Sequence, residues 1–187
     1  MPKKRKNEEQ IEILPFEDNY IICAADLSLR CPGFCLLEMD KGNIKNVELF
    51  SLNNKGKKKT HGQILNEIYD LFFNNVIHEL NIFPPLYYVR EKMVMNLKVP
   101  SERDVAKVVG LMDFILGAGN KEWHEIYPVT VKKIITGSGK AEKSEVAAGL
   151  EKYIGKQNYK CDDESDAAAV AVAWLIQQGQ IKELPNV

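Results

Sequence analysis

A cluster of acidic residues runs directly into an alanine-rich apolar stretch near the end of the chain. The acidic part is Asp162-Asp163-Glu164-Ser165-Asp166, and only apolar residues follow, from Ala167 to Trp174. This pattern predicts a buried helix over residues 164–178, which places Asp163 and Asp166 on one face. An aspartate suits a helix start as a cap and as a partner of the helix dipole. A cap needs only one such residue, however, whereas a divalent metal site requires several carboxylates.

Composition limits the class of protein. With 187 residues and 45% hydrophobic content, the chain is large enough for one domain with its own core. The 25 basic and 26 acidic residues nearly cancel, so a nucleic-acid partner would have to be recognised by local patches. We expect a disordered basic arm over residues 1–18 and a single domain over 19–187. We also expect no membrane span or signal peptide. The basic run at residues 2–6 resembles a nuclear import signal but is equally a DNA-tethering arm, and we expect a cytoplasmic protein.

The remaining sequence alternates between strand-like and helix-like segments. An apolar run that ends in Asp26 predicts a strand buried on both faces, and a turn at residues 40–43 predicts a hairpin. Three hairpin strands followed by helix–strand alternation predict an α/β domain with a mixed five-stranded sheet flanked by helices. The expected strands cover residues 19–26, 33–39, 44–52, 86–91 and 123–127, and the expected helices begin near Thr60, Ser101, Pro128, Ala141 and Glu164.

Acids that are distant in sequence are expected to meet at one edge of this sheet. Asp26 and Glu91 each end a predicted strand, and sites in open α/β sheets form beyond the carboxyl ends of adjacent strands. Together with Asp163 and Asp166 they would repel one another unless cations neutralised them. Two Mg²⁺ ions about 4 Å apart would do so, as in enzymes that hydrolyse phosphodiesters. An all-oxygen ligand set favours Mg²⁺ or Mn²⁺ over zinc. The alternative is a set of unrelated strand-end and cap acids.

The cysteines and histidines do not indicate a second metal site. Cys31 and Cys35 have no second ligand pair at zinc spacing, so we interpret them as reduced, buried thiols. The three histidines are scattered and form no ligand pattern.

Four blocks of the sequence resemble the RuvC-type Holliday-junction resolvases of the ribonuclease H-like superfamily, over about residues 20–178. The first block carries an acid followed by an arginine and a Gly-aromatic pair, the second is an acidic strand end, the third is a lysine-bearing turn and helix, and the fourth is an Asp-x-x-Asp-Ala motif. In this chain they are residues 25–34, 88–91, 131–146 and 163–169. The resemblance implies a ribonuclease H-like fold. A phage or prophage is one source from which such a family member would come.

The resemblance also implies roles for individual residues. Asp26, Glu91, Asp163 and Asp166 match the catalytic, metal-binding acids, and Lys143 matches the lysine near the scissile phosphate. Lys132 matches a lysine that contacts the DNA backbone, and we expect Lys140 and Arg30 to bind DNA as well. Outside this resemblance, such lysines would be interpreted as a solvated helix face.

Some positions depart from the family pattern. Leu27-Ser28 stands where the family often has Pro-Gly. The aromatic wedge that follows the second acid has no clear counterpart, and Met93 or Met95 would serve either as a softer wedge or in packing. The basic segments at residues 3–6 and 55–59 are outside the family motifs. They are either phosphate contacts or a solvated tail and loop.

The predicted activity is Mg²⁺-dependent resolution of four-way DNA junctions by symmetric paired nicks. Two symmetric cuts imply a homodimer, and the helix that begins at Ser101 is either its interface or a core helix. In the first case, Asp104 and Lys107 would lie at the rim. The alternatives are a related nuclease for other branched DNA or RNA and a DNA-structure-binding protein without nuclease activity.

Overall fold

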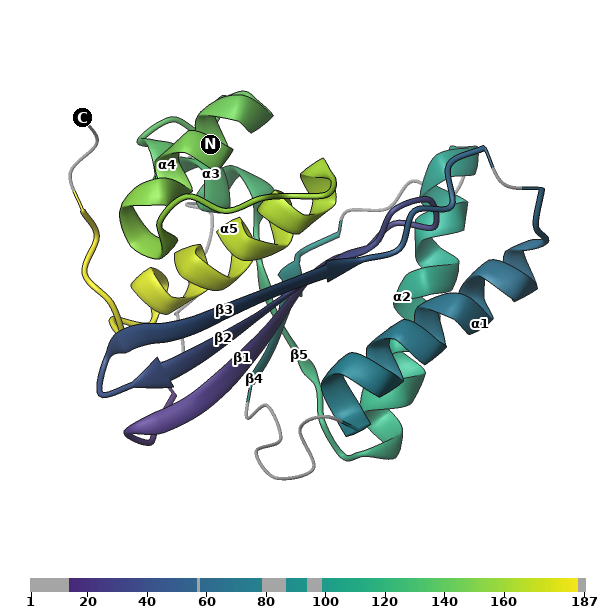
Figure 1. Ribbon diagram of the computed structural model, residues 1–187, viewed down its shortest axis with the longest axis horizontal. Helices are drawn as coiled ribbons and strands as arrows, with labels where there is room; N and C mark the ends of the chain where they lie inside the picture. The colour runs from purple at the N-terminus through teal and green to yellow at the C-terminus, as the bar shows by residue number, and fades with distance from the viewer. Residues whose placement is uncertain (1–13, 57, 79–86, 94–98, 185–187) are drawn as a thin grey trace, which may run out of the picture.

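A mixed five-stranded sheet forms the centre of the molecule. The computed structural model describes residues 14–56, 58–78, 87–93 and 99–184, and the strand order within this part is β3-β2-β1-β4-β5 (Figure 1). The central strand β1 (Asn19–Asp26) pairs antiparallel with β2 (Gly33–Asp40), which pairs antiparallel with β3 (Asn43–Ser51). On its other side β1 pairs parallel with β4 (Tyr87–Glu91), and β4 pairs parallel with β5 (Trp123–Ile126). The prediction of a mixed five-stranded sheet is confirmed.

Helices cover both faces of this sheet (Figure 1). One face is packed by α1 (His61–Phe72), which continues into a π-helical turn at Phe73–His78, and by α2 (Pro100–Ala118). The other face is packed by α3 (Pro128–Thr136), α4 (Lys143–Ile154) and α5 (Asp162–Gln177). Successive residues of β1 face opposite sides, so Ile22 lies in one core and Cys23 in the other. This explains why the strand is a continuous apolar run.

The helix α5 lies directly on the sheet, against β1 and β2. Ala167, Ala168, Ala169, Ala171 and Ala173 are all completely or almost completely buried. Because their side chains end at Cβ, the helix backbone approaches the strands closely. The first turn of α5 therefore lies beside the end of β1.

The segment before β1 also belongs to the packed structure. Leu14 and Phe16 pack against the core, and the Phe16 ring lies 4.6 Å from that of Tyr87 and 5.7 Å from that of Trp174, between centroids. The predicted arm thus includes a segment, residues 14–18, that contacts the domain. Residues 1–13, with the basic run, lie outside the described residues.

The apolar stripe of α2 faces its own core. Val108, Met112 and Leu116 are buried against α1 and the sheet, while Phe114, on the outward side, is 74% exposed. The core alternative for this stripe is therefore correct. None of the helices in the described ranges is long and apolar enough to cross a membrane.

Candidate metal centre

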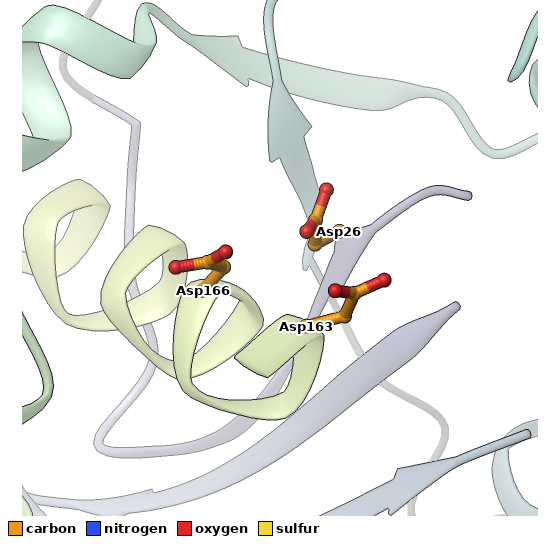
Figure 2. Close-up of side chains that lie close together, drawn as sticks. All are labelled: Asp26, Asp163 and Asp166. Carbon is orange, nitrogen blue, oxygen red and sulfur yellow. The ribbon is translucent and has the colours of Figure 1, made fainter. Parts of the chain in front are cut away.

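Three carboxylates meet where β1 ends and α5 begins. Asp26 is the last residue of β1, and Asp163 and Asp166 lie in the first turns of α5 (Figure 2). Each offers one carboxylate oxygen to a group in which all these atoms lie within 4.8 Å of one another. All three residues are partly buried. Such a set of converging oxygen ligands suits a divalent cation.

The close approach of these acids depends on a glycine in the neighbouring strand. Gly33 is paired with Asp26 across the antiparallel β1–β2 ladder. A Cβ atom at Gly33 would lie 2.1 Å from the carbonyl oxygen of Asp163 and 2.6 Å from the amide nitrogen of Glu164. Only a residue without a side chain lets the backbone of α5 approach β2 so closely. Gly33 therefore sets the distance from Asp163 to Asp26.

The fourth predicted acid, Glu91, lies beside this group and outside it. It ends β4, one residue beyond Arg90, which is paired with Ala25 of β1. Glu91 and Asp26 line a cleft of about 220 Å³, together with Lys92, Met93 and Pro128 among others. The sheet thus carries Glu91 to the same edge as Asp26, on the side opposite β2.

Crowding of the acids alters their ionisation. Burial raises the pKa of Asp26 to about 8, and repulsion from Asp163, Asp166 and Glu91 contributes to this rise. Burial is also the main cause of the raised pKa of Glu91, with repulsion from Asp166 second. The pKa of Asp163 is raised, again mainly by burial. Adding a cation would remove this repulsion, so the cluster has the electrostatic character of a metal site.

One lysine reaches the cluster from the adjoining helix. Lys143, the first residue of α4, donates a hydrogen bond from Nζ to Oδ2 of Asp166 over 2.6 Å. Burial lowers the pKa of Lys143, but the bond to Asp166 and the charges of Asp166, Asp163 and Asp26 raise it overall above its usual value. The side chain therefore stays a cation at the rim of the cluster.

The other predicted DNA-binding residues occupy different positions. Lys132 donates from Nζ to the carbonyl oxygen of Ala141 over 2.8 Å, across the turn between α3 and α4. Its charge also offsets part of the rise in the pKa of Glu91 that burial and Asp166 cause. Lys140 is exposed on the same turn, which leaves α3 through Gly137 at a φ of 80°. Arg30 is exposed in the loop between β1 and β2.

Comparison with known proteins assigns the chain to a family. The family model of the crossover junction endodeoxyribonuclease RuvC matches residues 22–174. The chain belongs to the RuvC family. This membership confirms the predicted family, the ribonuclease H-like fold and the prediction of an endodeoxyribonuclease that acts on crossover junctions. The matched range includes the three clustered aspartates, Glu91 and Lys143.

Curated relatives are similar over most of their length. The crossover junction endodeoxyribonuclease RuvC of Ehrlichia ruminantium, strain Gardel, is 28% identical over 156 residues, which cover 82% of this chain and 95% of the relative. The RuvC of Halothermothrix orenii is 24% identical over 156 residues, which cover 81% of this chain and 90% of the relative.

Solved structures share the fold. Thermus thermophilus RuvC in complex with a Holliday junction substrate aligns with a TM-score of 0.64 at 16% identity, covering 88% of this chain and 99% of that one. The Fowlpox virus resolvase, solved in complex with Holliday junction DNA, aligns with a TM-score of 0.53 at 14% identity, covering 84% of this chain and 97% of that one.

Two residues beside the acid cluster have distinct partners. Glu164 is 1% exposed and points away from the cluster, where it accepts hydrogen bonds from Ser51 Oγ and the Lys160 amide, each over 2.7 Å. Its side chain therefore lies outside the metal site. Ser28 was not predicted as a site residue, yet its Oγ donates to Oδ2 of Asp163 over 2.9 Å. Its only sequence signal is a hydroxyl two residues after the acid that ends β1.

The apolar-wedge prediction is only partly within the described residues. Met93 lies beside Glu91, partly buried against the core of α1 and α2, and lines the cleft. Met95 lies outside the described residues.

Proposed function

We propose that this RuvC family member resolves four-way DNA junctions by symmetric paired nicks, with two Mg²⁺ ions held by Asp26, Glu91, Asp163 and Asp166. Mn²⁺ would substitute for Mg²⁺. The observation that carries the proposal is the group of three carboxylates within 4.8 Å of one another, located inside the segment that matches the family. Curated relatives bear the name crossover junction endodeoxyribonuclease, and two similar structures contain Holliday junction DNA.

The chemistry of the donor set supports a hard divalent cation. All the donors are carboxylate oxygens, which Mg²⁺ and Mn²⁺ prefer. Burial raises the pKa of Asp26, and repulsion from the neighbouring acids adds to this rise, which Lys143 offsets only in part. When bound, such cations lower the pKa of water and stabilise charge on a leaving oxygen.

The remaining residues would bind and orient the substrate. Lys143, 2.6 Å from Asp166, is placed to attract the phosphate that approaches the acids. The exposed Lys140 and the α4 N-terminus lie on the same side and favour an anionic ligand. Lys132 holds the turn between α3 and α4 through its hydrogen bond to Ala141. We therefore propose that it stabilises this surface as well as contacting the DNA backbone. Arg30 would contact DNA on the other side of the acids, from the loop after β1.

Paired nicks require two active sites, and we propose a two-fold homodimer. The outward face of α2 supports this proposal, because Phe114 presents a large apolar side chain to solvent in the single chain. Asp104 and Lys107, which we expect at the rim of this interface, form an ion pair with each other over 2.8 Å, and Lys107 Nζ lies 2.6 Å from Nδ1 of His61 on α1. Because the proposed substrate is recombining DNA, we infer that the protein acts in the cytoplasm of a bacterial or phage-infected cell.

The decisive experiment is cleavage of synthetic DNA by the wild type and Asp26→Asn. Symmetric nicking of a four-way junction should depend on Mg²⁺ and be lost in the variant, whereas junction binding should persist. Asp162→Asn is the matched control, because Asp162 is an aspartate next to Asp163 in the first turn of α5 and is exposed outside the cluster. Flaps, RNA–DNA hybrids and simple duplex should be poor substrates. Equal cutting of duplex would refute junction resolution, and nicking by Asp26→Asn would refute the assigned metal site.

A further inference from the structure

The loop between β1 and β2 contacts the acid cluster through one hydroxyl. Leu27 and Leu29 are 6% and 5% exposed and anchor this loop in the core shared with α1 and α2. Ser28, between them, is directed towards α5, and its Oγ donates to Oδ2 of Asp163 over 2.9 Å. The loop is thus fixed on one side by packing and linked on the other to a carboxylate of the cluster.

The orientation of this hydroxyl is itself fixed. Ser28 Oγ accepts a hydrogen bond from the backbone amide of Cys31 over 3.0 Å. Because an amide can only donate, the Ser28 hydroxyl proton is left to point at Asp163. A serine hydroxyl has one proton and two lone pairs, so both of these contacts are satisfied together. The Asp163 carboxylate keeps Oδ1 and one lone pair of Oδ2 for other partners.

The bond is not required as a cap for α5. The N-cap position of this helix is Cys161, which makes no side-chain cap bond. The neighbouring acid, Glu164, has a structural role, because its carboxylate is buried and accepts hydrogen bonds from Ser51 and Lys160. Asp163, by contrast, is partly exposed and faces two other acids. The hydrogen bond from Ser28 therefore orients a carboxylate that is directed at the proposed metal site.

We propose that Ser28 is a positioning residue, which holds the Asp163 carboxylate in the orientation that binds the catalytic cation. This inference rests on the proposed function, because it requires Asp163 to be a metal ligand. Hydrogen-bond partners of ligating carboxylates typically contribute about 10- to 100-fold to metal affinity or activity. Ser28 is such a hydrogen-bond partner of the Asp163 carboxylate.

The test measures cation binding directly, without DNA. Calorimetric titration with Mn²⁺ should show binding weakened about 10-fold in Ser28→Ala. Ser28→Gly also removes the hydroxyl and should give the same shift, whereas Ser28→Thr keeps the hydroxyl and should restore affinity. The Mg²⁺ concentration for half-maximal junction nicking should rise in parallel, with junction binding in EDTA unchanged.

Ser51→Ala is the matched control, because it removes a serine–carboxylate bond from the buried acid next to Asp163. It should lower the Tm and leave Mn²⁺ affinity as in the wild type. If Ser28→Ala and Ser28→Gly both bind Mn²⁺ with wild-type affinity and Asp26→Asn is inactive, the inference about Ser28 is overturned and the proposed function stands. Full nicking activity in Asp26→Asn would instead overturn the proposed function, and the inference with it.

Discussion

Replacing Gly33 with alanine tests whether backbone proximity sets the geometry of the acid cluster. The added Cβ would lie 2.1 Å from the Asp163 carbonyl oxygen, whereas ordinary contacts begin at 3.4 Å, so the first turn of α5 must move by about 1.3 Å. The obstacle is backbone, which cannot rotate out of the way as a side chain can. Asp163 therefore moves away from Asp26, because Asp26 is paired with Gly33 and stays with the sheet.

Two effects of Gly33→Ala have to be compared. Overpacking costs about 1–3 kcal/mol, which a domain of ordinary stability, about 5–15 kcal/mol, survives. Misplacement of a catalytic group by about 1 Å costs roughly 100-fold in rate. The variant should therefore remain folded while junction nicking slows by about two orders of magnitude.

The assay is single-turnover nicking of a four-way junction, with circular dichroism and thermal unfolding on the same samples. Gly62→Ala, in α1, is the matched control, because the nearest atom to its added Cβ is Thr60 Oγ1, 4.0 Å away. It should nick as the wild type does. A folded Gly33→Ala protein with the wild-type rate and Mg²⁺ requirement would refute the argument that the absent side chain positions Asp163.

Three further predictions concern charge, pH and assembly. Lys143→Ala removes the ammonium 2.6 Å from Asp166 and should slow single-turnover nicking about 100-fold, while junction affinity measured in Ca²⁺ should fall by much less, because other residues also contact the DNA. In the metal-free protein Asp26 holds its proton up to a pH of about 8, whereas the unfolded chain releases it near 4. Unfolding therefore releases a proton between these values, so stability should fall as pH rises, by up to about 1.4 kcal/mol per pH unit, and level off above pH 8. Thermal melts in EDTA should show this slope, and Asp26→Asn should flatten it. Phe114→Glu should give a folded monomer by light scattering and uncouple the paired nicks, because its side chain is 74% exposed in the single chain.

Each of these has a contradicting result. An unchanged nicking rate in Lys143→Ala would remove the lysine from the mechanism. The same pH slope in Asp26→Asn as in the wild type would assign the titration to another group. A dimer that persists in Phe114→Glu would place the interface elsewhere.

The acids were accessible to sequence reasoning because each occupies a position with a strong local signal. Asp26 ends an apolar strand and Asp163 and Asp166 begin an apolar helix, so topology alone brings them to one edge of the sheet. Ser28 has no such signal. Its role depends on the path of an irregular loop, and nothing in the local sequence specifies where a single hydroxyl will point.

The apolar stripe of α2 shows a second limit of the sequence. A helix that packs on its own core and a helix that packs on a second subunit have the same periodicity. Only the packing shows that Met112 faces inward and Phe114 outward. Likewise, the polar composition of the chain start gave no indication that Phe16 would pack against Trp174.

The buried side chain of Glu164 has a consequence for how this chain can vary. A helix turns by about 100° per residue, so inserting or deleting one residue between Cys161 and Ala167 would rotate Glu164 out of its contacts with Ser51 and Lys160. The same rotation would direct Asp163 or Asp166 away from Asp26. Length changes should therefore be tolerated in the loop before Cys161 and rejected within the acidic run, where Glu164 locks the rotational register of the helix.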